Sequence, residues 1–180
     1  MIQLNTKRTF LRPPVQLALA SVFAALVCVA TLTLVVSIPV TSGYFNLGET
    51  VIYVAALLFG PIVGGVAGGA GAAIADIIVA PQYGIGTLVA KGIEGTIVGI
   101  LSKKLQKRTQ HFTLSSTIAV IIGGLEMVAG YFIYSQIALG VTFDAALVEI
   151  PFNILQMLVG LAIALPIMHA VLRVFPQLKS

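Results

Sequence analysis

A lysine and a glutamate inside an apolar run are the residues best suited to chemistry in this sequence. Lys91 and Glu94 lie three residues apart in the stretch Leu88–Val98, and Thr87 precedes Lys91 by four, so on a helix the three side chains share a face. An ionisable group in a bilayer costs about 2.5–3.5 kcal/mol on insertion scales, so such groups usually face a bundle interior or a water-filled cavity. Two interpretations follow: Lys91 and Glu94 line a binding site for a polar solute, or they form a structural ion pair that neutralises itself.

The composition defines the class of protein. Of the 180 residues, 58% are hydrophobic and 9% are charged, whereas a soluble domain has about 25% charged residues. Because a membrane span takes roughly 20 residues, six spans joined by short loops use nearly the whole length. We therefore expect a single membrane domain over residues 1–180. It leaves no space for a soluble catalytic or nucleotide-binding domain, so an ATPase that drove transport would be another chain.

Apolar runs and helix breakers divide the chain into six segments. The expected helices cover residues 15–38, 49–59, 62–80, 87–101, 114–138 and 145–174. The second is short, ends at the break Gly60-Pro61, and either spans the bilayer or re-enters it. The third is rich in glycines at four-residue spacing, such as Gly64 and Gly68, which lets helices approach closely in lipid. The sequence thus predicts an all-α integral membrane protein, a compact bundle of six transmembrane helices.

The basic residues predict the orientation of this bundle. Of the ten lysines and arginines, all but Lys91 fall on one side if six segments alternate. They lie in residues 1–12, in a loop over residues 103–113, and near the C-terminus. The positive-inside rule therefore places both termini and this loop in the cytoplasm of a multi-pass protein of the cell membrane. The same distribution accounts for the net charge of +4 without nucleic acid as a partner.

Polar residues on two further helices join the lysine–glutamate pair. Glu126 falls near mid-bilayer in the fifth helix. In the sixth, Glu149, Asn153 and Gln156 are spaced by four and three residues, which is one helical face. Because polar stripes on three helices need a common interior, they favour a solute pocket open to the outside over an isolated ion pair.

Tyrosines gather on the outer side of the predicted topology. All five fall in the outer half: Tyr44, Tyr53, Tyr83, Tyr131 and Tyr134. Of these, Tyr44 and Tyr83, together with Phe45 and Tyr134, are candidates for stacking on a planar ring of a ligand. For an individual tyrosine, an interfacial aromatic belt is an equally good explanation.

Enzyme chemistry has no support in the motifs. The sequence contains neither His-Glu-x-x-His nor Gly-x-Ser-x-Gly. The two aspartates, Asp76 and Asp144, are expected near the outer surface, as are Glu49 and Glu149, and acids spread over separate helices do not form a divalent-metal cluster. Cys28 is the single cysteine, so the chain has no internal disulfide. We predict no enzymatic activity, no cofactor and no metal.

The run over residues 43–69, followed by Ala75-Asp76 and by the stretch Lys91–Gly95, resembles the S components of energy-coupling factor (ECF) vitamin transporters. The resemblance covers nearly the whole chain and is closest to the branch for riboflavin, thiamine-precursor and pyridoxine-type compounds. It implies the substrate-binding subunit of an ATP-driven importer, which captures a small vitamin or precursor such as hydroxymethylpyrimidine, pyridoxine or riboflavin from outside. The implied partners are a transmembrane coupling subunit and two ATPase subunits.

In that family the vitamin binds near the outer surface, through the loop after the first helix and through helices four to six. By position in the topology, the resemblance implies binding roles for Asn46, Lys91, Glu94, Glu126 and Asn153. Gln156 from the polar stripe, with Tyr44 and Tyr83 from the aromatic group, completes the expected substrate-binding set.

A small flat patch on the first helix is a candidate contact surface. Ala20 and Ala24 lie four residues apart, and such a patch accepts another helix closely in lipid, whether from this chain or from a partner. The two alanines match the Ala-x-x-x-Ala motif with which the resembling family docks its coupling subunit.

Two other functions remain open on the sequence: a stand-alone solute facilitator or channel, and a membrane protein with a structural or assembly role. For the importer, the ligand charge follows from the residues. Acids outnumber lysine in the expected pocket, so a neutral or cationic, amine-bearing ring is favoured over a dianion, with Glu94 or Glu126 pairing to an aminopyrimidine or pyridine.

Overall fold

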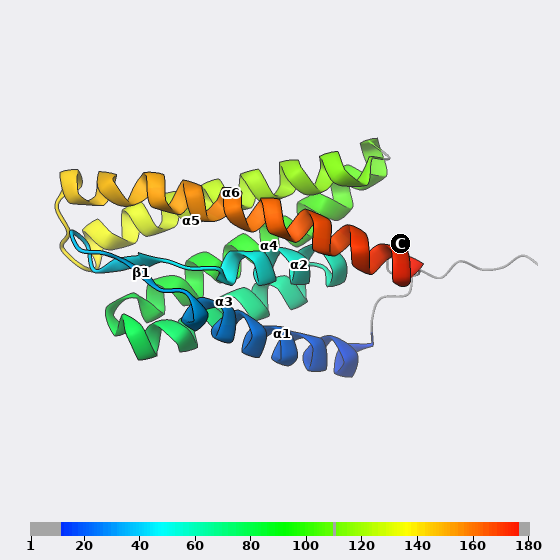
Figure 1. Ribbon diagram of the computed structural model, residues 1–180, viewed down its shortest axis with the longest axis horizontal. Coiled ribbons are helices and arrows are strands. Elements are labelled where there is room, and N and C mark those ends of the chain that lie inside the picture. The colour runs from blue at the N-terminus through cyan, green and yellow to red at the C-terminus, as the bar shows by residue number, and fades with distance from the viewer. Residues whose placement is uncertain (1–11, 110, 177–180) are drawn as a thin grey trace, which may run out of the picture.

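Six α-helices and one small hairpin make up the computed structural model, which describes residues 12–109 and 111–176 (Figure 1). The elements are α1 (Pro13–Thr33), β1 (Val36–Ile38), β2 (Gly43–Phe45), α2 (Gly48–Phe59), α3 (Pro61–Val79), the 3-10 turn η1 (Pro81–Tyr83), α4 (Gly84–Thr109), α5 (Phe112–Ile137) and α6 (Phe143–Val174). Among the described residues, five helices are long and apolar enough to cross a membrane, and α2 is shorter. The prediction of an all-α membrane bundle with a short second helix is confirmed.

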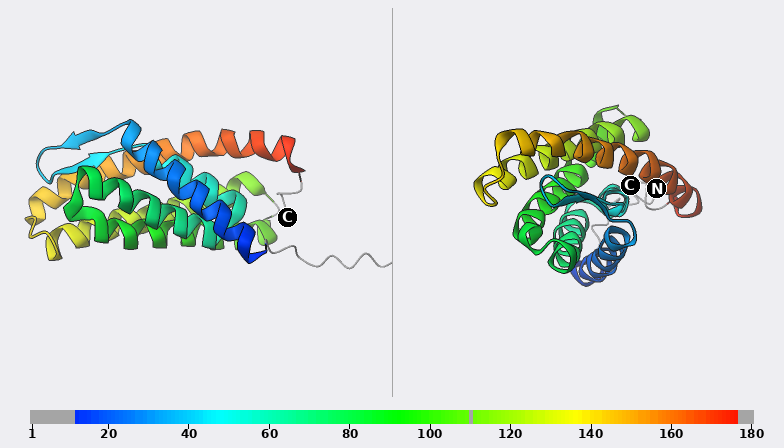
Figure 2. Two further views of the ribbon diagram at one scale, coloured as in Figure 1. Left: turned by 90° about the horizontal axis from the view of Figure 1, so that it is seen from below. Right: turned by 60° about the vertical axis from the view of Figure 1, so that its left-hand side comes forward.

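The helices run along one axis, so the bundle has two ends (Figures 1 and 2). The hairpin, η1 and the α5–α6 connection lie at one end; the start of α1, the α4–α5 connection and the end of α6 lie at the other. The second end carries Arg12, the basic residues of 103–108, and Arg173. By the positive-inside rule, the hairpin end faces outward. Residues 1–11 and 177–180, predicted to be cytoplasmic, lie outside the described part.

The hairpin replaces the predicted end of the first helix. Hydropathy predicts a helix to Ile38, but α1 ends at Thr33, and β1 pairs with β2 in an antiparallel register that sets Ser37 opposite Tyr44. A continuous apolar run does not distinguish a buried helix from a strand, and the β-branched residues of this segment favour the strand. Ser42, at φ 60°, closes the turn with an N–H bond to the Ile38 carbonyl. The hairpin therefore covers the outer end of the bundle.

The short helix α2 descends from the hairpin toward the basic end. Its twelve residues span about 18 Å at 1.5 Å per residue. It begins beside α4, where Glu49 pairs with Lys91, and it ends at Gly60, where an added Cβ would lie 2.6 Å from Lys103 Nζ. Since Lys103 belongs to the basic end of α4, α2 passes inward through the bundle and does not turn back at the outer surface.

Glycines bring α3 against α4 with their backbones in contact. A Cβ on Gly68 would lie 2.6 Å from the Lys91 carbonyl oxygen, and one on Gly69 would lie 2.8 Å from that of Leu88. Approaches this close exclude any larger residue, so the prediction that the glycine repeat serves tight helix packing is confirmed. The rigid α3–α4 pair positions the polar residues of both helices at the hairpin end.

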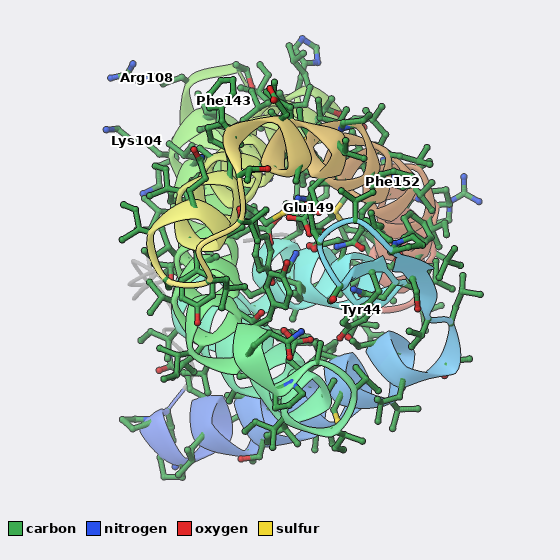
Figure 3. All side chains as sticks on the ribbon, turned by 90° about the vertical axis from the view of Figure 1, so that its left-hand side faces the viewer. Tyr44, Lys104, Arg108, Phe143, Glu149 and Phe152 are labelled. Carbon is green, nitrogen blue, oxygen red and sulfur yellow. The ribbon has the colours of Figure 1, made fainter. Side chains whose placement is uncertain are left out.

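The basic segment is helical, so the prediction of a cytoplasmic loop over residues 103–113 is wrong. The helix α4 continues to Thr109 and α5 begins at Phe112. At 1.5 Å per residue the 26 residues of α4 are about 39 Å long, more than the roughly 30 Å of a bilayer core. Seen from the hairpin end, Lys104 and Arg108 project outward from the bundle, whereas Tyr44 and Glu149 lie inside it (Figure 3). Basic residues are compatible with a helix that extends beyond the lipid.

Candidate functional site

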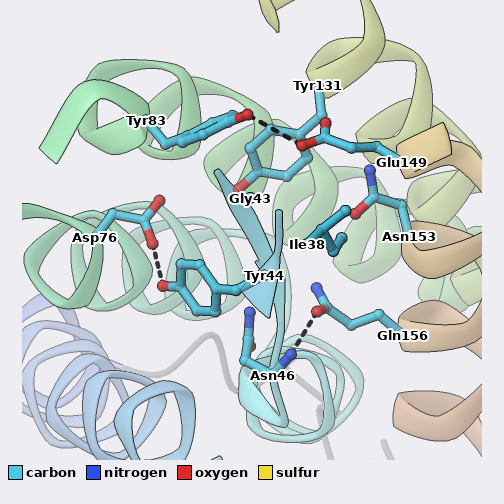
Figure 4. Close-up of a pocket in the computed structure, with 10 residues that line it drawn as sticks. All are labelled: Ile38, Gly43, Tyr44, Asn46, Asp76, Tyr83, Tyr131, Glu149, Asn153 and Gln156. Atoms are coloured by element: carbon cyan, nitrogen blue, oxygen red, sulfur yellow. Dashed lines mark hydrogen bonds between the residues drawn. The ribbon is translucent and has the colours of Figure 1, made fainter. Parts of the chain in front are cut away.

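A cavity lies between the hairpin, η1 and helices α3, α5 and α6. Its interior space is about 30 Å³, well below the roughly 300–1,000 Å³ usual for small-molecule sites, so the cavity is nearly closed in this structure. Ten residues line it: Ile38, Gly43, Tyr44, Asn46, Asp76, Tyr83, Tyr131, Glu149, Asn153 and Gln156 (Figure 4). Its walls thus combine three tyrosine rings with two carboxylates and three amides.

Asp76 ties the hairpin to the α3–α4 pair on one side of the cavity. Its carboxylate accepts hydrogen bonds from the hydroxyls of Tyr44 on β2 and Thr87 on α4. The Tyr131 hydroxyl of α5 lies 2.8 Å from Thr87 Oγ1 and extends this chain of hydrogen bonds. Burial and the neighbouring Asp76 raise the pKa of the Tyr44 hydroxyl above its ordinary value, so Tyr44 remains a donor at neutral pH.

Glu149 closes the opposite side. The Tyr83 hydroxyl lies 3.0 Å from Glu149 Oε1 and 2.9 Å from the backbone oxygen of Thr41 in the hairpin turn, and its one proton serves one acceptor at a time. Gly43 packs so closely on Glu149 that an added Cβ would overlap the carboxylate. A larger residue at this position would displace the end of the Glu149 side chain, which α6 holds directly against the strand β2.

Gln156 connects the cavity to the polar interior beneath it. Its Oε1 accepts from the backbone N–H of Asn46 at 2.8 Å, and its Nε2 donates to Glu49 Oε1 at 2.9 Å. The Asn46 side chain caps the start of α2 through a 2.8 Å bond from the Gly48 N–H. One amide therefore fixes the loop before α2 and the first turn of α2 relative to α6.

A charged network lies below Gln156. Lys91 forms ion pairs with Glu49 of α2 and with Glu94, whose Oε2 is 3.4 Å from Lys91 Nζ. The Tyr53 hydroxyl donates to Glu94 Oε1 at 2.7 Å. The Lys91 ammonium also lies 5.4 Å from the centroid of the ring of Tyr131, a residue that lines the cavity. Lys91, Glu94 and Glu49 are 3%, 0% and 1% exposed.

The structure separates the predicted pocket residues into two groups. Asn46, Asn153, Gln156, Tyr44 and Tyr83 line the cavity, as expected. The remaining three, Lys91, Glu94 and Glu126, do not line it and differ from the prediction in that respect. Helical spacing shows which residues share a face, but it does not show how far along the helix axis the cavity reaches. In addition, Glu49, which pairs with Lys91, comes from a distant part of the sequence.

Glu126, on α5, belongs neither to the cavity lining nor to the ion pairs of Lys91. It is half-buried, and its Oε2 is buried without a hydrogen-bond partner among residues 12–109 and 111–176. Its Oε1 is near the space that a Cβ on Gly130 would fill, at 3.7 Å, where α5 packs on Ala90. The side chain therefore belongs to the α4–α5 contact and not to the cavity wall.

Five lining residues were missing from the predicted set: Ile38, Gly43, Asp76, Tyr131 and Glu149. The signal for Glu149 was its place in the stripe with Asn153 and Gln156. Asp76 and Glu149 were expected near the outer surface by depth, and they lie at the hairpin end, where they are 5% and 4% exposed because the hairpin covers them. Of the acids expected there, only Asp144 is exposed; Glu49 is buried with Lys91.

The alanine patch on α1 faces the interior of this chain. Ala20 is 1% exposed and belongs to the core, and an added Cβ on Gly71 of α3 would lie against the backbone of Ala24. The patch therefore accepts a helix of the same chain, one of the two alternatives open on the sequence. Its role as a partner-docking surface is corrected for Ala20, which has no free surface, and Ala24 is half-buried.

The whole helical region also has relatives among known proteins. Residues 14–173 match the family described as "ECF-type riboflavin transporter, S component". This chain belongs to that family. As an S component it is a membrane-embedded substrate-binding subunit of an ECF importer, and the resemblance inferred from residues 43–95 is confirmed.

The chain is also similar to a protein of known sequence and to a solved structure. A protein of Pyrococcus woesei, described as "Uncharacterized protein in gap 3'region", is 38% identical over 137 residues, which cover 76% of this chain and 88% of that protein. A solved structure titled "Structure and mechanism of the S component of a bacterial ECF transporter" superposes with a TM-score of 0.69 over 91% of this chain and 99% of that chain. At 17% identity it shows the shared fold.

Proposed function

We propose that this S component captures a small vitamin-like ring compound from outside the cell in the cavity under the hairpin. The observation that carries the proposal is the position of the cavity. It lies at the end of the bundle opposite the basic residues, and its lining comes from the hairpin, α3, α5 and α6 together with η1 and Asn46. Riboflavin, pyridoxine and hydroxymethylpyrimidine are the ligand types to test first.

The lining supports a planar ligand with polar substituents. Tyr44, Tyr83 and Tyr131 offer ring faces and edges, and Tyr83 and Tyr131 are packed edge-on with centroids 6.3 Å apart. Asn46 and Asn153 add amide groups that donate and accept hydrogen bonds. The tyrosine rings can orient a planar ligand, and the asparagine amides can hydrogen-bond to polar groups on its edge.

Native mass spectrometry of the gently purified protein tests this proposal, because it identifies a retained compound without a guess about its structure. A thermal-shift panel of water-soluble vitamins and precursors complements it. We expect one compound of drug-fragment to vitamin size to bind and to stabilise the protein, by about 2.7 kcal/mol at one hundred times its dissociation constant. The proposal is overturned if the purified protein retains no compound and no compound in the panel stabilises it.

We further propose that an ATP-driven complex, with a transmembrane coupling subunit and two ATPase subunits, completes transport. The outward face of α1 supports a docking role, because it presents small residues beside exposed aliphatic ones. Ala18, Ser21 and Ala25 follow each other at three- and four-residue spacing and are exposed, as is Val22 between them. Docking is therefore assigned to this face and not to Ala20.

The alternative of a stand-alone facilitator or channel finds no supporting feature. Below the cavity, the buried Glu49–Lys91–Glu94 network and the core residues around Tyr53 fill the interior. Liposomes that contain this chain alone should therefore show no solute flux. Flux should require the coupling and ATPase subunits together with ATP.

A further inference from the structure

The interior around the cavity contains many more carboxyl groups than cationic side chains. Glu49, Asp76, Glu94 and Glu149 are each at most 5% exposed, and Glu126 is half-buried nearby on α5. The sequence contains a single lysine or arginine between residues 13 and 102, and none between 112 and 168. Five acids therefore share one cationic side chain in the outer part of the bundle.

This one cationic side chain, Lys91, already forms ion pairs with other residues. Lys91 pairs with Glu49 and with Glu94, and its ammonium lies over the Tyr131 ring. The lysine therefore cannot neutralise the two carboxylates of the lining, Asp76 and Glu149. Within the described residues, no lysine, arginine or histidine lines the cavity.

The two lining carboxylates differ in how many hydrogen-bond donors they already have. Asp76 accepts two hydroxyl donors, one on each oxygen, from Tyr44 and Thr87. Glu149 accepts one, on Oε1 from Tyr83, and that hydroxyl has Thr41 as a second acceptor. In residues 12–109 and 111–176, no donor reaches Glu149 Oε2. Glu149 is thus the carboxylate with capacity for a ligand, because a buried carboxylate needs hydrogen-bond donors or a cation to offset its desolvation.

Asn153 stands one helical turn after Glu149 on α6 and lines the same cavity (Figure 4). Its amide has no hydrogen bond to any other described side chain or backbone group. The pair therefore presents a carboxylate acceptor next to an amide that both donates and accepts. Its chemical complement is a planar N–C–N edge with two N–H donors, as in an amidinium or a protonated aminopyrimidine.

We propose that the cavity selects a cationic nitrogen heterocycle of the amidine or aminopyrimidine type, with Glu149 as its charge partner and Asn153 as its hydrogen-bond partner. The inference rests on the proposed function and specifies the substrate class of the same site. It assigns the charge recognition to Glu149, where the sequence favoured Glu94 or Glu126. A neutral ligand leaves the lining carboxylates uncompensated, and an anion adds repulsion from both.

The test compares two probes of the same shape and different charge, benzamidine and benzamide, at millimolar concentration with the purified full-length protein. Binding is measured by thermal shift and by ligand-observed NMR. Because Glu149→Gln keeps the shape and the acceptor for Tyr83, it removes charge with little change in packing. Asp144→Asn is the matched control, since Asp144 is an exposed acid in the first turn of the same helix. Asn153→Leu is a second variant that leaves the carboxylate intact.

We expect wild-type protein and Asp144→Asn to bind benzamidine at least about tenfold more tightly than benzamide, which corresponds to about 1.4 kcal/mol. Glu149→Gln should reduce this preference to within about twofold, and Asn153→Leu should weaken benzamidine binding while a charge preference remains. Equal binding of both probes by the wild type, or an unchanged preference in Glu149→Gln, overturns the inference.

A retained natural ligand gives a readout that separates this inference from the proposed function. A ligand that is cationic at neutral pH and is weakened by Glu149→Gln supports both. A neutral ligand such as riboflavin, bound tightly and unaffected by Glu149→Gln, overturns the substrate class and leaves the binding function intact. If neither probe binds and no compound is retained or stabilising, the proposed function itself fails.

Discussion

Lys91 on α4 and Glu49 at the start of α2 form an ion pair in the interior, although a stretch of glycine-rich α3 lies between them in the sequence. The lysine therefore connects two helices, and its helical neighbour Glu94 is a second partner at 3.4 Å. The structure therefore supports the ion-pair interpretation of Lys91 and Glu94, and neither residue lines the cavity. The residues form a structural ion pair, and that network lies directly beneath the cavity through Gln156.

Lys91→Met should destabilise the protein by about 3–5 kcal/mol, because it leaves Glu49 and Glu94 buried without their cation. For a protein of this size that corresponds to a decrease in Tm of at least about 6 °C in detergent. Lys104→Met, an exposed position on the same helix, is the control and should change Tm by less than about 2 °C. An unchanged Tm in Lys91→Met together with lost ligand binding would instead make the lysine a direct ligand contact.

Tyr44→Phe should loosen the hairpin without unfolding the bundle. The substitution removes the hydroxyl that joins β2 to Asp76, while the ring and the strand pairing remain. We expect faster amide hydrogen exchange in residues 34–46 and about 1–2 kcal/mol lower stability. Tyr134→Phe is the matched control, because its hydroxyl bonds the Gln82 carbonyl at an exposed position away from the hairpin. Equal exchange in both variants would contradict the role of Asp76 as the hairpin anchor.

Gly92→Ala and Gly95→Ala should have opposite effects on stability. At Gly92 the nearest atom to an added Cβ is 3.7 Å away, so alanine adds helix propensity, worth up to about 1 kcal/mol. At Gly95 the added Cβ would overlap the backbone of Gly64 on α3, so the two helices must separate. Thermal unfolding of both variants measures the difference. Two equally stable variants would show that α3 and α4 are not held at backbone contact.

Ala25→Trp should block assembly with the coupling subunit and leave ligand affinity within about twofold of wild type. Ala25 is exposed on the outward face of α1, away from the cavity. Ala20→Trp, in contrast, places a large ring in the core and should lower the yield of folded S component itself. Co-purification with the coupling subunit and the ligand-induced thermal shift measure the two effects. Normal co-purification of Ala25→Trp would remove this face as the docking surface.

Much of the architecture could be predicted because lipid imposes simple rules. Composition predicted the membrane class, basic residues predicted which helix ends lie together, and glycine spacing predicted the contact between α3 and α4. The hairpin could not be predicted in the same way, because residues 34–38 are as apolar as a helix that spans a bilayer. Only the pairing of Val36 with Phe45 distinguishes the strand.

The sequence predicted which side chains face the interior of the bundle, but not how far each one lies from the cavity. Helical periodicity correctly placed Asn153 and Gln156 toward the interior, since both line the cavity. It gave no distance between Lys91 and the cavity, because that depends on α2, whose Glu49 reaches the lysine from a different part of the chain. Asp76 was placed near the outer surface by depth but not in the binding set, because nothing local indicates that Tyr44 donates a hydrogen bond to it.

The pairing of a short helix with a later one has a consequence for biogenesis. The twelve residues of α2 are too few to insert as an independent span, and Glu49 in the first turn has a cationic partner, Lys91, that is made later, on α4. Gln156, the other side chain that satisfies Glu49, comes later still, on α6. During synthesis α2 therefore remains at the translocon or at the membrane interface until α4 and α6 have been made. The outer half of the bundle is completed only after the last helix has been inserted.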